Sequence, residues 1–421
     1  MGLNINTNLR TRRSTPLKAI GLVFLAVLIG FCATYGIKNV VNYLGRPQIS
    51  FSIFATVFIW AMFVRPIWTR TGTVLGMVGI TLTLGIMLLD KNFAHNLLKP
   101  DNAPIFLMIF FFSFFLWISM AQAHNNDRRM EEKLPPEEKE TSNQKTWVWP
   151  DLVYIELICM IVWTIILVVW SLVIPAPLEE PANPGNTPNP SKAPWYFLGL
   201  QELLVYFDPW MAGVVLPSII VFGLMAIPYI DRNEKGNGYY CFKDRRLAIL
   251  TFCIGFFVMW DYMIVLGTIL RGPGWNYFGP FEEWNPHKVV AANNTNLSEF
   301  VWIKGLYPLG NWLNIDWLKQ GVPQVDNVLF APGHFLYINW PNIGLLLKKE
   351  FMGIILLGSY FLVLPVVLAK TKLKNFYEQL GLGRYSVAIF LFLVMATVPM
   401  KMYLRWILAL KYIFASPWIN F

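Results

Sequence analysis

The chain has 421 residues, of which 56% are apolar, 16% aromatic and only 14% charged, and its mean hydropathy is +0.47. This composition excludes a soluble globular protein, because soluble domains carry about 25% charged residues. The net charge of +9 does not indicate nucleic-acid binding, since the 34 Lys and Arg residues lie in short runs between apolar stretches. The pattern is typical of an all-α protein that crosses a membrane several times.

Nine apolar stretches are candidates for transmembrane helices, each of which needs roughly 20 residues to cross a bilayer. Alternate connections between them hold 20 Lys and Arg residues on one side and 14 on the other, so the positive-inside rule predicts a cytoplasmic N-terminus. Arg10, Arg12 and Arg13 before the first stretch resemble a signal peptide, but no convincing small-x-small cleavage site follows, so we expect a retained anchor. The predicted spans cover residues 19–35, 49–64, 73–89, 104–121, 152–174, 211–230, 247–270, 351–369 and 386–400.

The predicted spans fall into three membrane regions. Residues 1–122 hold four spans with short loops, residues 151–270 hold three, and residues 351–421 hold the last two. An external loop region, residues 271–350, separates the second membrane region from the third and is rich in Trp, Pro, Gly and Asn at its start. We find no internal repeat among these regions.

Two charged segments are expected to stay outside the bilayer. Residues 123–150 mix both charges with two adjacent prolines, which predicts a solvated cytoplasmic linker. The C-terminal segment of residues 401–414 places Lys401 and Arg405 against Leu and Ile at helical spacing. It is therefore predicted to form a separate helix that lies along the membrane surface.

The sequence offers no clear set of metal or haem ligands. Its four cysteines form neither a CxxC nor a CxxCH motif. A b-type haem in a membrane is usually held by two imidazoles from facing helices, but no histidine lies in the middle of a predicted span. We therefore expect neither a metal site nor a b-type haem ligated by this chain. The histidines are His95, His124, His287 and His334.

Two acidic residues lie inside predicted spans, where a charge costs roughly 2.5 to 3.5 kcal/mol on insertion scales. Glu156 is about one turn from the cytoplasmic end of its span, and Asp261 lies deeper in its own span. Each is therefore a candidate functional residue. The alternative for each is a buried hydrogen bond between helices.

Residues 179–210 combine a proline-rich segment with an amphipathic one. Five prolines between Pro181 and Pro194 exclude a regular helix there. The residues that follow are mainly apolar and aromatic, but Gln201 and Glu202 place polar groups among them. Taken alone, this pattern also fits an aromatic belt at the membrane interface.

Residues 149–270 resemble, in order, the C-terminal part of cytochrome b, which stands alone as subunit IV in the photosynthetic cytochrome b/f complex. Three helices and the loop after the first of them are matched, and the third of five segments falls where the family carries its Pro-Glu-Trp-Tyr signature. The five segments are WPDLVYI (149–155), EEPANPGNTP (179–188), KAPWYFLGLQEL (192–203), LPSIIVFGLMAIPYID (216–231) and DRRLAILTF (244–252).

The resemblance implies a haem-free subunit of a quinol:cytochrome c oxidoreductase in a bacterial cytoplasmic membrane. In this family, quinone sites form where the haem-free half meets a haem-bearing cytochrome b N-terminal-type subunit. The implied partners are that subunit, a Rieske-type iron–sulfur protein, a c-type cytochrome and membrane lipids, in a multi-subunit complex that could be dimeric. The expected quinol is menaquinol, and its oxidation would be coupled to proton translocation. The spans outside residues 151–270 are expected to pack against sister subunits.

The resemblance also implies the site residues, with one departure from the family. Pro194 stands where the family has the Glu that accepts a quinol proton, and proline cannot titrate. Glu202, about two helical turns beyond Trp195, is the candidate replacement, unless it only contacts headgroups or solvent. The implied quinone-binding residues are Pro194, Trp195, Tyr196, Phe197 and Gln201 on the outer side, and Asp151 and Glu156 on the inner side.

Two other classes of protein stay open. A secondary transporter would use proline-broken segments and intramembrane carboxylates to bind a substrate at mid-depth, and would be expected to contain a repeat. A structural membrane scaffold would tolerate changes at Trp195, Tyr196 and Glu202. Co-purification with b-type and c-type haem would favour the quinol reductase over both.

Overall fold

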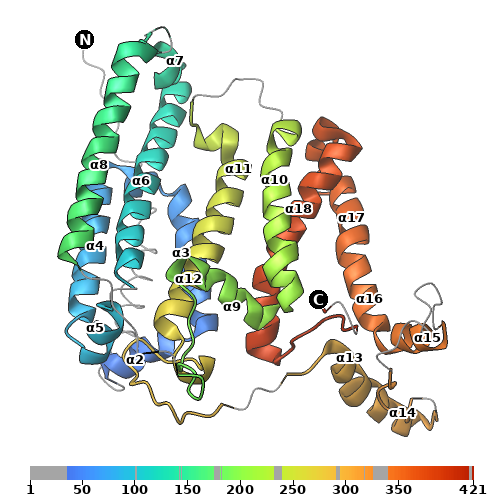
Figure 1. Ribbon diagram of the computed structural model, residues 1–421. Coiled ribbons are helices and arrows are strands. Elements are labelled where there is room, and N and C mark those ends of the chain that lie inside the picture. The colour runs from blue at the N-terminus through green and yellow to red at the C-terminus, as the bar shows by residue number, and fades with distance from the viewer. Residues whose placement is uncertain are drawn as a thin grey trace, which may run out of the picture.

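The computed structural model describes most of the chain from residue 36 onward, as helices packed side by side (Figure 1). No named β-strand occurs among the described residues, so the all-α, polytopic helical class is confirmed. The predicted span 19–35 and His334 lie outside the described residues. The described residues are 36–421 except 100–101, 142, 144, 175–180, 182, 232–238, 291–293, 317, 326–339 and 417–419.

The N-terminal region begins with a bent pair of helices and continues with two long ones. α2 and α3 meet at 79°, because Arg46 between them is extended and Pro47 begins α3. The hydroxyl of Thr69 caps α4 by accepting a hydrogen bond from the Gly72 amide at 3.2 Å. The elements are α2 (Ile37–Leu44), α3 (Pro47–Phe63), η1 (Arg65–Trp68), α4 (Arg70–Met87), α5 (Lys91–Leu97) and α6 (Ala103–Glu131).

The central region contains three long helices and several shorter elements, of which α9 does not cross the bundle (Figure 1). α9 ends at Tyr206 because Phe207 is extended and Pro209 follows. The elements are α7 (Glu137–Thr141), η2 (Val148–Leu152), α8 (Val153–Val173), η3 (Trp195–Phe197), α9 (Leu198–Tyr206), η4 (Met211–Val215), α10 (Leu216–Ile230), α11 (Phe242–Cys253), η5 (Ile254–Asp261), α12 (Tyr262–Val265) and η6 (Leu266–Leu270).

The C-terminal region places several short helices before its two long ones. The last helix, α18, bends at Gly381, whose φ of 74° is in the region that favours glycine. The elements are η7 (Pro273–Trp275), α13 (Leu297–Glu299), η8 (Phe300–Leu306), α14 (Tyr307–Leu313), α15 (Trp340–Lys349), α16 (Phe351–Gly358), η9 (Ser359–Val363), α17 (Leu364–Lys370) and α18 (Lys374–Leu408).

Seven helices of the described chain are long and apolar enough to cross a bilayer, and α2 with α3 makes an eighth if the bent pair counts as one span. Each predicted span after the first coincides with one of these helices. α7 and the start of α11 lie at one end of the bundle, whereas α9 and α13 to α15 lie at the other (Figure 1). The connections therefore form two groups, one at each end of the bundle, and the assignment of one end to the cytoplasm stays a prediction.

The polar linker is only partly solvated, which corrects the prediction for its first residues. α6 continues to Glu131, and Asn126 and Asp127 are buried within that extension. Both carboxylate oxygens of Asp127 accept a hydrogen bond from the Lys243 amide at 3.1 Å, and the Asn126 side chain donates to the Tyr240 carbonyl at 3.1 Å. These polar groups are buried because they bind the backbone at the start of α11.

The predicted surface helix at the C-terminus is wrong. Residues 401–408 continue α18, and the residues after it form a C-terminal strap, defined as residues 409–416 and 420–421, which folds back over the bundle. The Lys401 side chain is buried and donates a hydrogen bond to the Lys411 carbonyl at 2.6 Å. Its ammonium also lies 5.4 Å from the centre of the Phe207 ring. The strap thus supplies the polar partner that Lys401 would otherwise seek in water.

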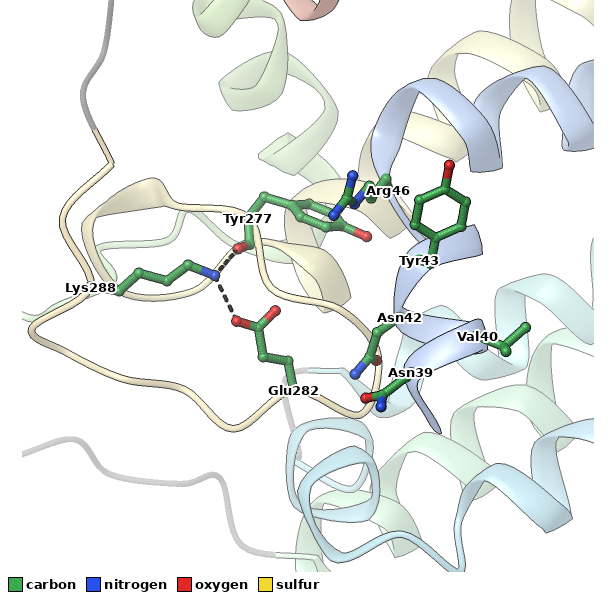
Figure 2. Close-up of a pocket in the computed structure, with 8 residues that line it drawn as sticks. All are labelled: Asn39, Val40, Asn42, Tyr43, Arg46, Tyr277, Glu282 and Lys288. Carbon is green, nitrogen blue, oxygen red and sulfur yellow. Dashed lines mark hydrogen bonds and ion pairs between the residues drawn. The ribbon is translucent and has the colours of Figure 1, made fainter. Parts of the chain in front are cut away.

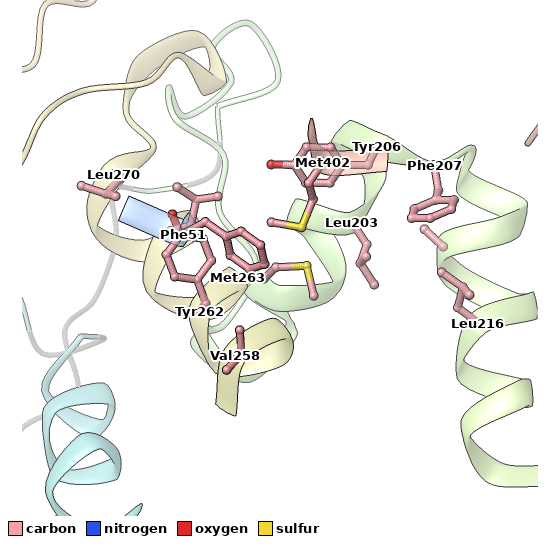
Figure 3. Packing of buried hydrophobic residues seen from close by; sticks show 12 residues of the cluster. Phe51, Leu203, Tyr206, Phe207, Leu216, Val258, Tyr262, Met263, Leu270 and Met402 are labelled. Atoms are coloured by element: carbon pink, nitrogen blue, oxygen red, sulfur yellow. The ribbon is translucent and has the colours of Figure 1, made fainter. Parts of the chain in front are cut away.

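The largest buried apolar cluster lies where α9 meets spanning helices of all three regions (Figure 3). Phe51 of α3, Leu203 of α9, Tyr262 of α12 and Met402 of α18 all belong to it. The rings of Phe51 and Tyr262 are 5.1 Å apart in an edge-to-face arrangement. Each fully buried side chain of this size stabilises the fold by about 1.5–3 kcal/mol. The cluster therefore holds α9 in place between α3, α12 and α18.

The C-terminal strap yields a testable prediction at Gly353 of α16. A Cβ atom at Gly353 would overlap the Ile413 carbonyl oxygen, whereas one at Gly358 would meet nothing within 4 Å. We expect Gly353→Ala to lower the free energy of unfolding by about 1–3 kcal/mol, because the strap must move away. Gly358→Ala should be neutral or slightly stabilising, since alanine favours helix by about 1 kcal/mol. Thermal unfolding in detergent, followed by tryptophan fluorescence, measures both, and equal midpoints would contradict the prediction.

Candidate functional site

Gln201 of α9 holds the preceding segment, residues 191–193, against the helix by hydrogen bonds. The side-chain oxygen of Gln201 accepts a hydrogen bond from the Ala193 amide at 2.8 Å, and its nitrogen donates to the Ser191 carbonyl at 3.0 Å. α9 then packs closely on η5 and α12. A Cβ atom at Gly199 of α9 would lie only 3.2 Å from the Ile264 side chain of α12, so the absence of a side chain at Gly199 permits this approach. Gln201, predicted to bind quinone, thus has a structural role in shaping the loop.

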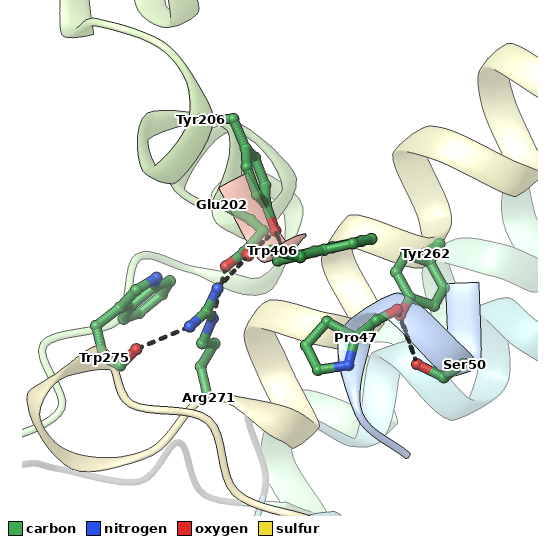
Figure 4. Close-up of polar contacts among 8 residues, drawn as sticks. All are labelled: Pro47, Ser50, Glu202, Tyr206, Tyr262, Arg271, Trp275 and Trp406. Atoms are coloured by element: carbon green, nitrogen blue, oxygen red, sulfur yellow. Dashed lines mark hydrogen bonds and ion pairs between the residues drawn. The ribbon is translucent and has the colours of Figure 1, made fainter. Parts of the chain in front are cut away.

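Glu202 lies at the centre of a buried polar network (Figure 4). Its two carboxylate oxygens accept hydrogen bonds from Nη2 and Nε of Arg271 at 2.7 and 3.1 Å. One of them also accepts from the Tyr206 hydroxyl at 2.8 Å, which in turn accepts from the Trp406 indole at 3.2 Å. Arg271 donates further to the Trp275 carbonyl at 3.0 Å. The network joins α9, the residue after η6, the external loop and α18.

The network keeps Glu202 as a buried, paired carboxylate. Its side chain has no exposed surface, and the Arg271 side chain is 11% exposed. Glu202 therefore contacts neither headgroups nor solvent, which was the alternative to a proton-accepting role. Burial and the neighbouring Glu202 charge raise the pKa of Tyr206 well above its usual value, so Tyr206 remains a donor.

A second polar contact joins α12 to the bend between α2 and α3 (Figure 4). The hydroxyl groups of Tyr262 and Ser50 are 2.6 Å apart, and the Tyr262 hydroxyl also donates to the Pro47 carbonyl at 3.0 Å. Helices of the N-terminal and central regions are thus held together by buried hydrogen bonds as well as by the apolar cluster. Both polar contacts lie at the α9 end of the bundle.

The aromatic residues of η3 point outward rather than into the bundle. Tyr196 is 52% exposed and Phe197 is 54% exposed, and their ring centres are 4.8 Å apart. Trp195 is half-buried and Pro194 is exposed. These side chains form a surface on η3, which packs against α12. A ligand would therefore reach them from outside the chain.

Asp151 and Glu156 lie far along the bundle from η3 and α9. Both are exposed at the start of the η2–α8 helix, which begins at the α7 end (Figure 1). No residue of α8 is buried, and Glu156 is the single charged residue in that helix. The structure therefore separates the residues assigned to the inner side from those assigned to the outer side.

Asp261 ends η5, one residue before α12, and is half-buried. Its Oδ1 atom is buried and has no hydrogen-bond partner among the residues that the structure describes. The alternative of a fully satisfied interhelical hydrogen bond is thus not found for this oxygen. An unsatisfied carboxylate oxygen at membrane depth is costly, and such groups are typical of functional positions.

Sequence reasoning missed two cationic residues beside α9. Arg271 follows directly after the predicted span 247–270, so the sequence indicates a charged residue at the end of the bundle. No neighbouring residue in the sequence indicates that Arg271 pairs with Glu202. Lys192 donates to the Thr268 carbonyl at 2.7 Å and lies 5.0 Å from the centre of the Trp284 ring. Burial, assisted by the charges of Lys99 and Arg271, lowers the pKa of Lys192 to about 7.

No group of three or more His, Cys, Asp or Glu residues that could hold a metal ion occurs in the described part of the chain. His287 is exposed in the external loop, and His124 lies near the end of α6, where its Nε2 is 3.3 Å from the Met62 carbonyl.

Comparison with known proteins places this site in a recognised domain. Residues 181–270 match the family model described as cytochrome b(C-terminal)/b6/petD. The match includes η3, α9 and the helices to η6, and it ends one residue before Arg271. The chain is thus a multi-pass helical membrane protein with a segment similar to the cytochrome b C-terminal domain, which confirms the resemblance over these residues. No solved structure matches the chain.

The buried ion pair makes a testable prediction about stability. We expect Glu202→Gln to lower the free energy of unfolding by about 3–5 kcal/mol, because it leaves the buried Arg271 charge unpaired. The double variant Glu202→Gln/Arg271→Gln should recover part of that loss. Denaturant titration of the purified chain in detergent measures both.

The matched control is Glu378→Gln. Glu378 forms an exposed pair with Lys374 at 3.8 Å, and such pairs contribute about 1 kcal/mol or less. Equal losses for Glu202→Gln and Glu378→Gln would show that the buried pair does not hold α9.

Proposed function

We propose that the chain is the haem-free, cytochrome b C-terminal-type subunit of a quinol-oxidising complex in a bacterial cytoplasmic membrane. The observation that carries this proposal is the family match over residues 181–270. The positive-inside count supports an orientation in which the α9 end of the bundle faces the periplasm. We further propose, from the resemblance, that the quinol is menaquinol and that the electron acceptor is a c-type cytochrome.

The outer quinol site would form between η3 and a haem-bearing cytochrome b N-terminal-type subunit. Tyr196 and Phe197 support this, because their exposed rings offer an apolar surface against which a quinol ring can stack. An inner quinone site would form near Asp151 and Glu156 at the other end of the bundle. The b-type haem and the iron–sulfur centre of the partners would take the two electrons, while residues of this chain position the ring and receive a proton.

Two carboxylates compete for the role of outer proton acceptor. Glu202 has no exposed surface, and both of its carboxylate oxygens already accept hydrogen bonds from Arg271. Asp261 has an unpaired oxygen and directly precedes α12, the helix on which η3 packs. We therefore propose Asp261, whose free oxygen has no partner among the described residues, as the acceptor, with Glu202 as a paired charge that positions α9.

The proposed function predicts which cofactors accompany the chain. A gentle purification of the tagged chain from its host membrane should yield bound partners and a reduced-minus-oxidised spectrum with b-type and c-type haem bands. The chain separated from all partners should show no b-type haem band. A transporter or scaffold would purify without haem, and that result would contradict the proposal.

The choice between the two carboxylates is tested in the assembled complex. We expect Asp261→Asn to slow quinol oxidation by about 100-fold at unchanged haem content, since general-base catalysis contributes about 10²–10⁴-fold. Glu202→Gln/Arg271→Gln should retain most of the turnover, and Asp316→Asn in the exposed loop is the control. A large loss only in the double variant would return the proton-accepting role to Glu202.

A further inference from the structure

A polar cavity lies between α2 and the external loop, beside the bend that joins α2 to α3 (Figure 2). Its volume is about 640 Å³, within the range of about 300–1,000 Å³ typical of ligand pockets. Asn39 and Tyr43 of α2, Arg46 at the bend and Tyr277 of the external loop are among the residues that line it. None of them has a place in the proposed quinol chemistry.

The two walls of the cavity are held together by direct contacts. The side-chain oxygen of Asn42 accepts a hydrogen bond from the Phe281 amide at 2.8 Å. A Cβ atom at Gly279 would lie only 2.6 Å from the Asn42 side chain, so the loop approaches α2 closely there. The cavity is therefore a formed feature of the fold, bounded by packed backbone on both sides.

Among the described residues, the charges around the cavity leave Arg46 without an acidic partner. Lys288 pairs with Glu282 at 2.7 Å, and its ammonium also donates to the Tyr277 carbonyl at 2.8 Å (Figure 2). Arg46 lies over the Tyr43 ring at 4.9 Å and forms no ion pair with any described residue. Residues 1–35, which lead into α2, contain no Asp or Glu, so they supply no counter-charge either. The two cations and one acid lining the cavity give a net charge of +1.

Tyr277, which lines the cavity, carries a buried donor. The Tyr277 hydroxyl is buried and has no hydrogen-bond partner among the described residues. It lies against the α2–α3 bend, 3.1 Å from where a Cβ atom of Gly45 would be. A buried hydroxyl without a partner is costly, and a ligand that accepts a hydrogen bond would remove that cost.

The position of the cavity suits a ligand from the membrane surface. α2 lies across the end of the bundle at 79° to α3, as a helix in the interface plane does (Figure 1). Tyr43 is 46% exposed, and tyrosine is enriched at the headgroup level. The guanidinium of Arg46 offers paired N–H donors that fit two phosphate oxygens, and the Tyr277 hydroxyl offers a third donor.

We propose that this cavity binds the phosphate group of an anionic phospholipid, with Arg46 and Tyr277 as its ligands. A soluble phosphate compound shares that chemistry and is the other source to be distinguished. This proposal does not rest on the quinol-oxidising function. Its test therefore measures binding and needs no turnover.

The test uses the full chain in nanodiscs that contain phosphatidylcholine with or without phosphatidylglycerol. Native mass spectrometry should find one phosphatidylglycerol retained per chain. We expect about tenfold weaker retention in Arg46→Gln and a severalfold loss in Tyr277→Phe, which removes only the hydroxyl and provides a second variant if Arg46→Gln does not fold. Arg70→Gln, at an exposed arginine that begins α4, should retain the lipid as the parent does.

A second arm adds inorganic phosphate or glycerol 3-phosphate to phosphatidylcholine nanodiscs and follows thermal unfolding. If either compound stabilises the parent but not Arg46→Gln or Tyr277→Phe, and phosphatidylglycerol is not retained, the source of the phosphate is soluble. The proposal is overturned if neither the lipid nor the soluble phosphates distinguish the parent from both variants.

Discussion

The buried ion pair between Glu202 and Arg271 is the interaction on which the arrangement at the α9 end depends. Arg271 lies at the end of a spanning helix, and Glu202 lies on a short helix that does not cross the bundle. Without its partner, either charge would be left in a nearly dry interior at a cost of several kcal/mol. The pair therefore sets the register of α9 on the bundle, and with it the exposed rings of η3.

A second buried cation, Lys401, is satisfied in a different way. No carboxylate of the described chain pairs with it, but the C-terminal strap provides the Lys411 carbonyl and the rings of Tyr412 and Phe421. The Phe207 ring, after α9, also lies beside its ammonium. The strap also places the Ala415 amide 3.3 Å from the buried Glu350 carboxylate. It thus connects α16 and α18 through polar contacts that an isolated helix pair would lack. The strap residues therefore contribute to the fold although they are not helical.

Sequence patterns were sufficient for features that are encoded locally. Apolar stretches located eight of the predicted spans, and the prolines before Pro194 correctly excluded a regular helix there. The missed features all depend on contacts between distant residues. Asp127 is buried because it binds Lys243 more than 100 residues later, and Arg271 is recognisable only once α9 is seen beside it. Charge patterning assigned Lys401 to the membrane surface because the pattern of charges does not show that the C-terminal strap folds back over this residue.

The polar groups in the membrane region fall into two classes, and the division bears on the proposed function. Glu202, Arg271 and Lys401 are satisfied within the chain, so they account for its fold. Glu156 and the free oxygen of Asp261 are not satisfied by the described residues, and both occur on half-buried or exposed helix faces. A charge that a fold leaves unpaired at membrane depth needs a partner from outside it. The proposed haem-bearing subunit and its quinones would meet the chain on these faces, and the satisfied charges would keep those faces in position.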